Sequence, residues 1–89
     1  MNHDWTPARR RYKELQTALD GALRLLRFIP AGDARADQLE RVGLLQDQAA
    51  VAHIAVHRRG AVSDGLRRAA DGSRRAAVAE RARTTRKAA

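Results

Sequence analysis

The fold follows from residues 6–33, TPARRRYKELQTALDGALRLLRFIPAGD, which contain the start, the apolar side and the end of one helix. Thr6 can cap this helix with its hydroxyl, and Pro7 suits the first helical position, where its missing N–H leaves no hydrogen bond unmade. Pro30 ends the helix, so we expect it over residues 7–29. Apolar residues recur along it at alternating steps of three and four, as in a heptad seam: Tyr12, Leu15, Leu19, Ala22, Leu26 and Ile29.

A second helix is predicted over residues 33–59, with Asp33 as its cap and Gly60 at its end. The linker after Pro30 is short, which favours an antiparallel neighbour and therefore a helical hairpin. One apolar stripe on this helix repeats the steps of three and four: Val42, Leu45, Ala49, Ala52 and Val56. A second row lies beside it: Leu44, Val51 and Ala55, with Ile54 on the flank. One partner helix rarely covers so wide a face, so we expect the C-terminal segment or a second copy to pack there as well.

Positive charge is concentrated at the C-terminal end of this chain of net charge +8. Residues 58–89 carry ten Lys and Arg against three Asp and Glu, whereas residues 31–57 carry two against four. A basic end on a nearly neutral body favours a polyanionic partner, because Lys and Arg displace counterions from phosphates. We expect nucleic acid, and DNA rather than RNA, because one Trp, one Tyr and one Phe offer little of the stacking on which RNA readers rely.

The C-terminal residues predict two short basic helices. The stretch VSDGLRRAA, residues 62–70, can form the first with Ser63 as its cap, and Asp71-Gly72 is a turn signal. Ser73 can then cap a last helix that ends near Arg86. The arginines of that last helix point to several sides, so we expect it to have no clean buried face. The predicted fold is all-α, with a lead (1–6), a hairpin (7–59) and a basic segment (60–89).

Residues 62–83 resemble the helix-turn-helix of small actinobacterial DNA-binding regulators and of sigma-factor-like domains. Leu66 matches the apolar position of the first helix, Ala70 the residue before the turn, and SRRAA, residues 73–77, the start of the recognition helix. The resemblance implies that the major groove is contacted by Ser73, Arg74, Arg75 and Val78, and that phosphates are contacted by Arg67, Arg68, Arg81 and Arg83. Arg86 and Lys87 complete the predicted nucleic-acid-binding set.

The sequence predicts no metal, cofactor or catalytic site. There is no cysteine, and the stretch HIAVH from His53 to His57 has the spacing of a zinc motif without its acidic residue or a third ligand. We expect these histidines to be hydrogen-bonded or solvent-facing, and we expect no enzyme and no small-molecule substrate. No apolar run approaches the ~18 residues of a membrane span, and the first residues lack the apolar segment of a signal peptide. A cytoplasmic protein without a membrane partner is therefore expected.

Different classes of function fit these features. The first is a small DNA-binding protein, a transcriptional regulator or accessory factor, that contacts DNA through its arginine-rich C-terminal helices and that a symmetric dimer would suit. The second is a helical protein-interaction module of a phage, secretion or polymerase-associated assembly, with the basic segment as a tether. An RNA- or ribosome-associated factor fits the charge equally. A homodimer or a larger protein partner would bind the apolar faces of residues 12–29 and 39–56.

Overall fold

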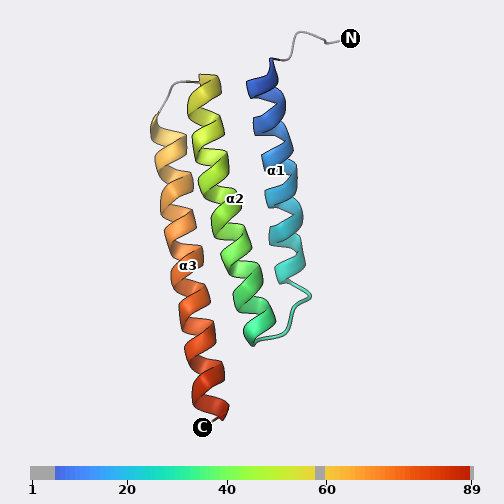
Figure 1. The fold of residues 1–89 in the computed structure, drawn as a ribbon, viewed down its shortest axis with the longest axis vertical. Helices are drawn as coiled ribbons and strands as arrows, with labels where there is room; N and C mark the ends of the chain where they lie inside the picture. Colours follow the sequence, from blue (N-terminus) through green and yellow to red (C-terminus); the bar gives the residue numbers. More distant parts are fainter. Residues whose placement is uncertain (1–5, 58–59, 89) are drawn as a thin grey trace.

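Three α-helices lie side by side in a single layer in the computed structural model, which describes residues 6–57 and 60–88 (Figure 1). They are α1 (Pro7–Leu26), α2 (Asp33–His57) and α3 (Gly60–Ala88). The central helix, α2, runs antiparallel to both of its neighbours. The all-α class and the helical hairpin of α1 and α2 are therefore confirmed.

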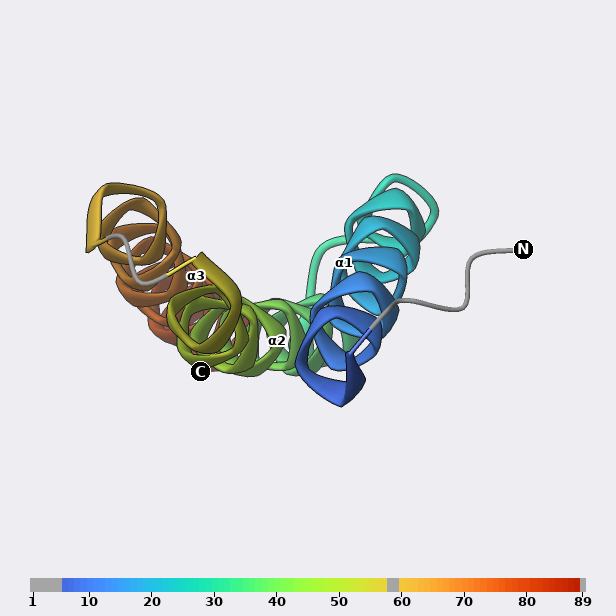
Figure 2. The same ribbon diagram turned by 90° about the horizontal axis from the view of Figure 1, so that it is seen from above.

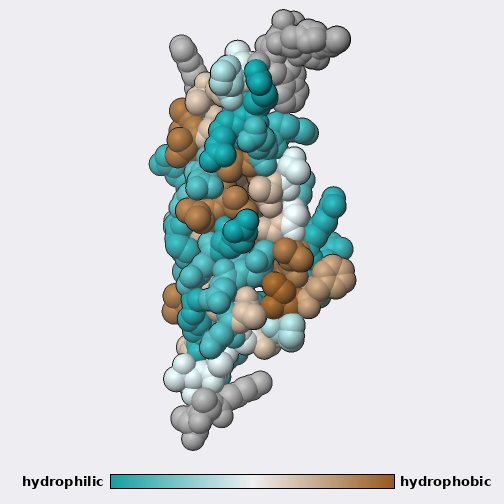
Figure 3. Space-filling model, turned by 45° about the vertical axis from the view of Figure 1, so that its right-hand side comes forward, coloured by the Kyte–Doolittle hydropathy of each residue, from teal (hydrophilic) through white to brown (hydrophobic). Residues whose placement is uncertain are grey.

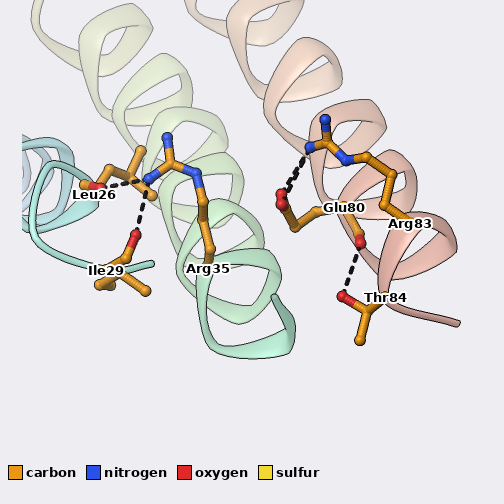
Figure 4. A network of polar contacts seen from close by, with 6 residues as sticks. All are labelled: Leu26, Ile29, Arg35, Glu80, Arg83 and Thr84. Carbon is orange, nitrogen blue, oxygen red and sulfur yellow. Dashed lines mark hydrogen bonds and ion pairs between the residues drawn. The ribbon is translucent and has the colours of Figure 1, made fainter. Parts of the chain in front are cut away.

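The first helix begins as predicted and ends three residues early. The Thr6 hydroxyl accepts a hydrogen bond from the backbone N–H of Arg9 at 3.2 Å, as expected of an N-cap. At the other end, the Arg35 side chain of α2 donates to the carbonyl oxygens of Leu26 and Ile29 (Figure 4). These bonds satisfy carbonyls that a helix end leaves without partners, so a tight turn replaces the expected last turn of helix.

The core between α1 and α2 is formed by the two predicted heptad stripes. Its buried members come from both helices: Leu15, Ala22, Val42, Leu45, Ala49 and Ala52. Partly buried side chains pack around them: Tyr12, Leu19, Leu26 and Leu66. The periodicity of the sequence therefore identified the side of each hairpin helix that faces the other.

The C-terminal segment differs from the prediction, because residues 60–88 form one continuous helix. Gly60, expected to end α2, is the first residue of α3, and Asp71 and Gly72, expected to form a turn, lie in its interior. The two-helix arrangement implied by the resemblance is not formed there. The physical reason is that alanine and arginine, which dominate this segment, are strong helix formers, and two interior glycines at about 1 kcal/mol each do not outweigh them.

The last basic helix was expected to have no clean buried face. In the structure, small side chains give α3 such a face. Ser63, Ala70 and Ala77, spaced seven residues apart, are each at most 1% exposed. Opposite them on α2 stands Gly43, where an added Cβ would lie only 3.2 Å from the carbonyl oxygen of Ala70. The backbones of α2 and α3 therefore approach closely, and the contact depends on small size rather than on bulky apolar groups.

The layer is curved and open on one side. Figure 2 shows α2 at the bend, with α1 and α3 on either side of it. Among the described residues, α1 and α3 each pack on α2, and no Cα of one comes within 8 Å of a Cα of the other. Between them lies a groove of about 280 Å³ whose apolar lining comes from all three helices: Tyr12, Leu19, Ala49, Val62 and Leu66.

Candidate nucleic-acid interface

All predicted nucleic-acid-binding residues lie on α3, which forms one edge of the layer. Since α2 is the one described helix whose Cα atoms come within 8 Å of those of α3, a side chain on α3 contacts α2, borders the groove towards α1 or points away from the layer. The predicted set divides along this line. Its members on the α2 side are Ser73, Arg74 and Arg81, those opposite the buried face are Arg68, Arg75 and Arg86, and Arg67 and Val78 are exposed on the flank between them.

On the α2 side, Ser73 and Arg74 hold the two helices together. The Ser73 hydroxyl donates to the Oε1 atom of Gln46 at 2.7 Å, and Gln46 is buried. One Nη atom of Arg74 donates to Asp47 of α2 at 2.6 Å, and the other to Asp71 of α3. These residues were expected in the major groove, but the structure gives them partners within the protein.

Arg81 has the same role one heptad further along the helix. Its guanidinium donates to the carboxylates of Glu40 and Asp37, both on α2. Hydrogen bonds to carboxylates raise the pKa of both arginines further, with Glu40 as the largest cause for Arg81 and Asp47 for Arg74. The local charge of both arginines is balanced by acidic neighbours, so neither is an ideal phosphate ligand.

Arg83 is also paired, in this case within its own helix. One Nη atom lies 2.7 Å and 3.1 Å from the two carboxylate oxygens of Glu80, whose side chain is 3% exposed (Figure 4). Thr84 is bonded to the backbone carbonyl of Glu80 at 3.2 Å. Arg83, Glu80 and Thr84 border a cavity of about 420 Å³ beside Arg35. Arg83 therefore gives a partner to a buried carboxylate, which would be costly to bury alone.

Three of the four remaining predicted arginines form a row on the outer edge of α3. We call Arg68, Arg75 and Arg86 the outer arginine row; they lie on the side of α3 opposite its buried face. Arg86 donates only to a backbone carbonyl of its own helix, and neither Arg68 nor Arg75 forms an ion pair with any residue that the structure describes. From Arg68 to Arg86 the row is about 27 Å long at 1.5 Å per residue.

Arg67 and Val78 are also exposed, Val78 to 68%. Their predicted contacts with nucleic acid stay predictions. Lys87 belongs to α3, but its side chain lies outside the described residues.

The acidic residues of α2 that pair with α3 are not among the residues predicted from the sequence. Asp47 lies opposite Arg74, and Glu40 lies opposite Arg81, so two acidic residues seven apart face two basic residues seven apart in antiparallel register. That spacing is visible in the sequence. It would have identified Arg74 and Arg81 as contacts to α2, had the acidic stripe been compared with the basic one.

The two histidines of α2 form an aromatic cluster with Tyr12 of α1. The ring centroids of His53 and His57 are 4.6 Å apart, and that of Tyr12 lies 5.2 Å from that of His53. His53 is buried, and its Nδ1 atom has no hydrogen-bond partner, which differs from the satisfied or solvent-facing histidine expected. Within the described parts of the chain, no three histidine or acidic side chains gather as a metal site would require.

Comparisons of the chain with protein-family models, curated proteins and solved structures gave no match. Among the helices that the structure describes, none has the length and hydropathy that crossing a bilayer requires.

Proposed function

We propose that this protein binds duplex DNA through the outer arginine row of α3, as an accessory or regulatory DNA-binding factor. The observation that carries the proposal is the division of charge on α3: Arg74, Arg81 and Arg83 are paired with carboxylates, whereas Arg68 and Arg75 have no acidic partner among the described residues. Unpaired guanidiniums in a row are suited to phosphates, since each phosphate contact releases condensed counterions.

The shape of α3 also supports a duplex as the partner. An α-helix fits the major groove of B-DNA, which is about 12 Å wide, and α3 is an edge helix whose outer side is unobstructed within the layer. Val78, exposed beside the row, has the apolar character that contacts a thymine methyl group. RNA is less favoured, because the three aromatic residues of the chain give few stacking surfaces.

Removing the row tests the proposal. The triple variant Arg68→Ala, Arg75→Ala and Arg86→Ala is expected to lose most of its affinity for a random-sequence duplex at low salt. The slope of log K against log salt should fall by about 2–3, since each lost phosphate contact removes about 0.9. Fluorescence anisotropy with a labelled duplex, between roughly 50 and 200 mM salt, measures both quantities.

A charge-matched control separates the row from the general charge of the protein. Arg24→Ala, Arg27→Ala and Arg41→Ala remove the same charge from exposed positions outside α3 and should leave most of the affinity and slope in place. All six positions are exposed and alanine favours helix, so circular dichroism should show both variants folded. Equal losses in the two triple variants, or no binding by the unaltered protein at low salt, would rule out the row as the DNA contact.

A further inference from the structure

A second cavity continues the groove between α1 and α3. The first, which we call the apolar cavity, has a volume of about 280 Å³ and is lined by Ala49 of α2 and Leu66 of α3, among others. The second, the arginine cavity, has about 420 Å³ and is lined on the same two helices by Arg35 and Glu80. Each of these residues lies fourteen positions from its counterpart on the same helix. Fourteen residues make about four turns, so both cavities open on the same side of the layer, about 21 Å apart.

Two guanidiniums with donors to spare line the arginine cavity (Figure 4). Arg35 contacts the carbonyl oxygens of Leu26 and Ile29 through one Nη atom. Arg83 contacts Glu80 through one Nη atom. The other Nη and the Nε of both arginines have no partner among the described residues. Because carbonyl oxygens carry no net charge, the charge of Arg35 is not balanced, and its free donors suit a carboxylate.

The wall that α1 contributes is basic towards the arginine cavity. A hollow of about 300 Å³ extends along α1 from Asp20, which also lines the apolar cavity, to Arg27. Five basic and two acidic side chains line the two cavities and this hollow: Lys13, Arg24, Arg27, Arg35 and Arg83, with Asp20 and Glu80. The groove is therefore apolar at one end and positively charged at the other.

The apolar side chains of the groove are only partly covered. Tyr12, Leu19 and Leu66 pack around the core of the hairpin without being fully buried, and Val62 is 49% exposed. Figure 3 shows hydrophobic areas on the surface of the molecule that are divided by hydrophilic ones. In the apolar cavity, side chains from three helices converge on one hollow. A hollow of this kind suits the apolar side of an amphipathic helix.

We propose that the groove binds an acidic amphipathic helix of another protein. A helix laid between α1 and α3, on the concave side of the layer, completes a four-helix bundle (Figure 2). Its apolar side chains occupy the apolar cavity, and a carboxylate about four turns away reaches Arg35 and Arg83. The separation of the two cavities sets the length of this helix at about 15 residues or more.

Charge favours a different protein over a second copy of this chain. α1 carries five Lys and Arg against two Asp and Glu, and α3 carries eight against three. Neither helix complements a basic groove. The acidic helix of the chain is α2, but its carboxylates at Asp37, Glu40 and Asp47 already bind Arg81 and Arg74 of α3.

A synthetic peptide tests the proposal. The probe is a helix of about 18 residues with leucine on one side and glutamate and alanine on the others, labelled for fluorescence anisotropy. It should bind the unaltered protein with a Kd of about 10–100 μM. Two control peptides, one with lysine in place of glutamate and one with glutamine in place of leucine, should each bind at least about tenfold more weakly.

Glutamate substitutions place the peptide in the groove. Val62→Glu in the apolar cavity and Arg27→Glu on the α1 wall should each weaken the acidic peptide at least about tenfold. Leu44→Glu and Arg41→Glu make the same charge changes at exposed positions that line neither cavity, and they should change the Kd by less than about threefold. All four positions are exposed and glutamate favours helix, so the variants should remain folded.

Each contrary result overturns the proposal. No binding of the acidic peptide at millimolar concentration excludes such a partner, and equal binding of the lysine or glutamine peptide removes the charge or the apolar contact on which the proposal depends. Equal losses in the groove variants and their controls assign the binding to the general charge of the protein. The triple variant that removes the outer arginine row should bind the peptide normally, and a loss there would move the peptide to the row. Because the peptide assay contains no nucleic acid, the groove is tested independently of DNA binding.

Discussion

Leu15→Ala is expected to lower the free energy of unfolding by about 2–5 kcal/mol. Leu15 is 4% exposed and belongs to the core that joins α1 to α2, so its removal loses apolar burial and leaves a cavity. A domain of this size has little stability in reserve, and such a loss should unfold a large share of the molecules at 37 °C. Urea unfolding followed by far-UV circular dichroism measures the change.

Leu25→Ala is the control for this prediction. Leu25 lies on the same helix but is 53% exposed, so its truncation should change stability by no more than about 0.5 kcal/mol. Equal losses from the two variants would mean that Leu25 is covered in solution, and a negligible loss from Leu15→Ala would contradict the described core.

Gly43→Leu is expected to separate α3 from α2. A Cβ at Gly43 already lies 3.2 Å from the carbonyl oxygen of Ala70 and 3.3 Å from Cγ of Arg74, and a leucine adds three further carbons. Overpacking of this kind costs about 3 kcal/mol, which outweighs a gain in helix propensity of somewhat under 1 kcal/mol. Hydrogen exchange should then become faster across α3, while α1 and the side of α2 that faces it keep their protection.

The matched control is Gly21→Leu on α1. No atom lies within 4 Å of a Cβ built at Gly21, so only the propensity term applies and stability should rise by up to about 1 kcal/mol. If Gly43→Leu also stabilised the protein, α3 would not approach α2 as closely as described.

The hairpin could be predicted from the sequence because its signals are local or periodic. Thr6 and Pro7 mark a helix start, Pro30 marks a stop, and bulky apolar residues repeat along both helices. The packing of the third helix could not be predicted in this way, because α3 is buried through the small residues Ser63, Ala70 and Ala77 rather than through bulky apolar ones. Small residues carry little hydrophobic signal, and their importance emerges only from the close approach of two backbones.

The sequence places the candidate residues on the C-terminal segment, but it does not show which way each side chain points. All its residues lie on α3, yet a wheel of one helix cannot show that Arg74 faces Asp47 and that Arg75, its neighbour in sequence, faces away. The turn at Asp71 and Gly72 was predicted from a dipeptide preference. That preference is weaker than the summed helix propensity of the residues around it together with their packing on α2.

The order of the helices in space, α1 then α2 then α3, is also their order along the chain. Among the described residues, the helices whose backbones lie close together are therefore consecutive in the chain, and no early helix waits for a late one. Proteins dominated by such local contacts fold in microseconds to milliseconds, since little loop entropy is lost before packing begins. The hairpin of α1 and α2 can form before α3 has been synthesised, and α3 can then pack on it.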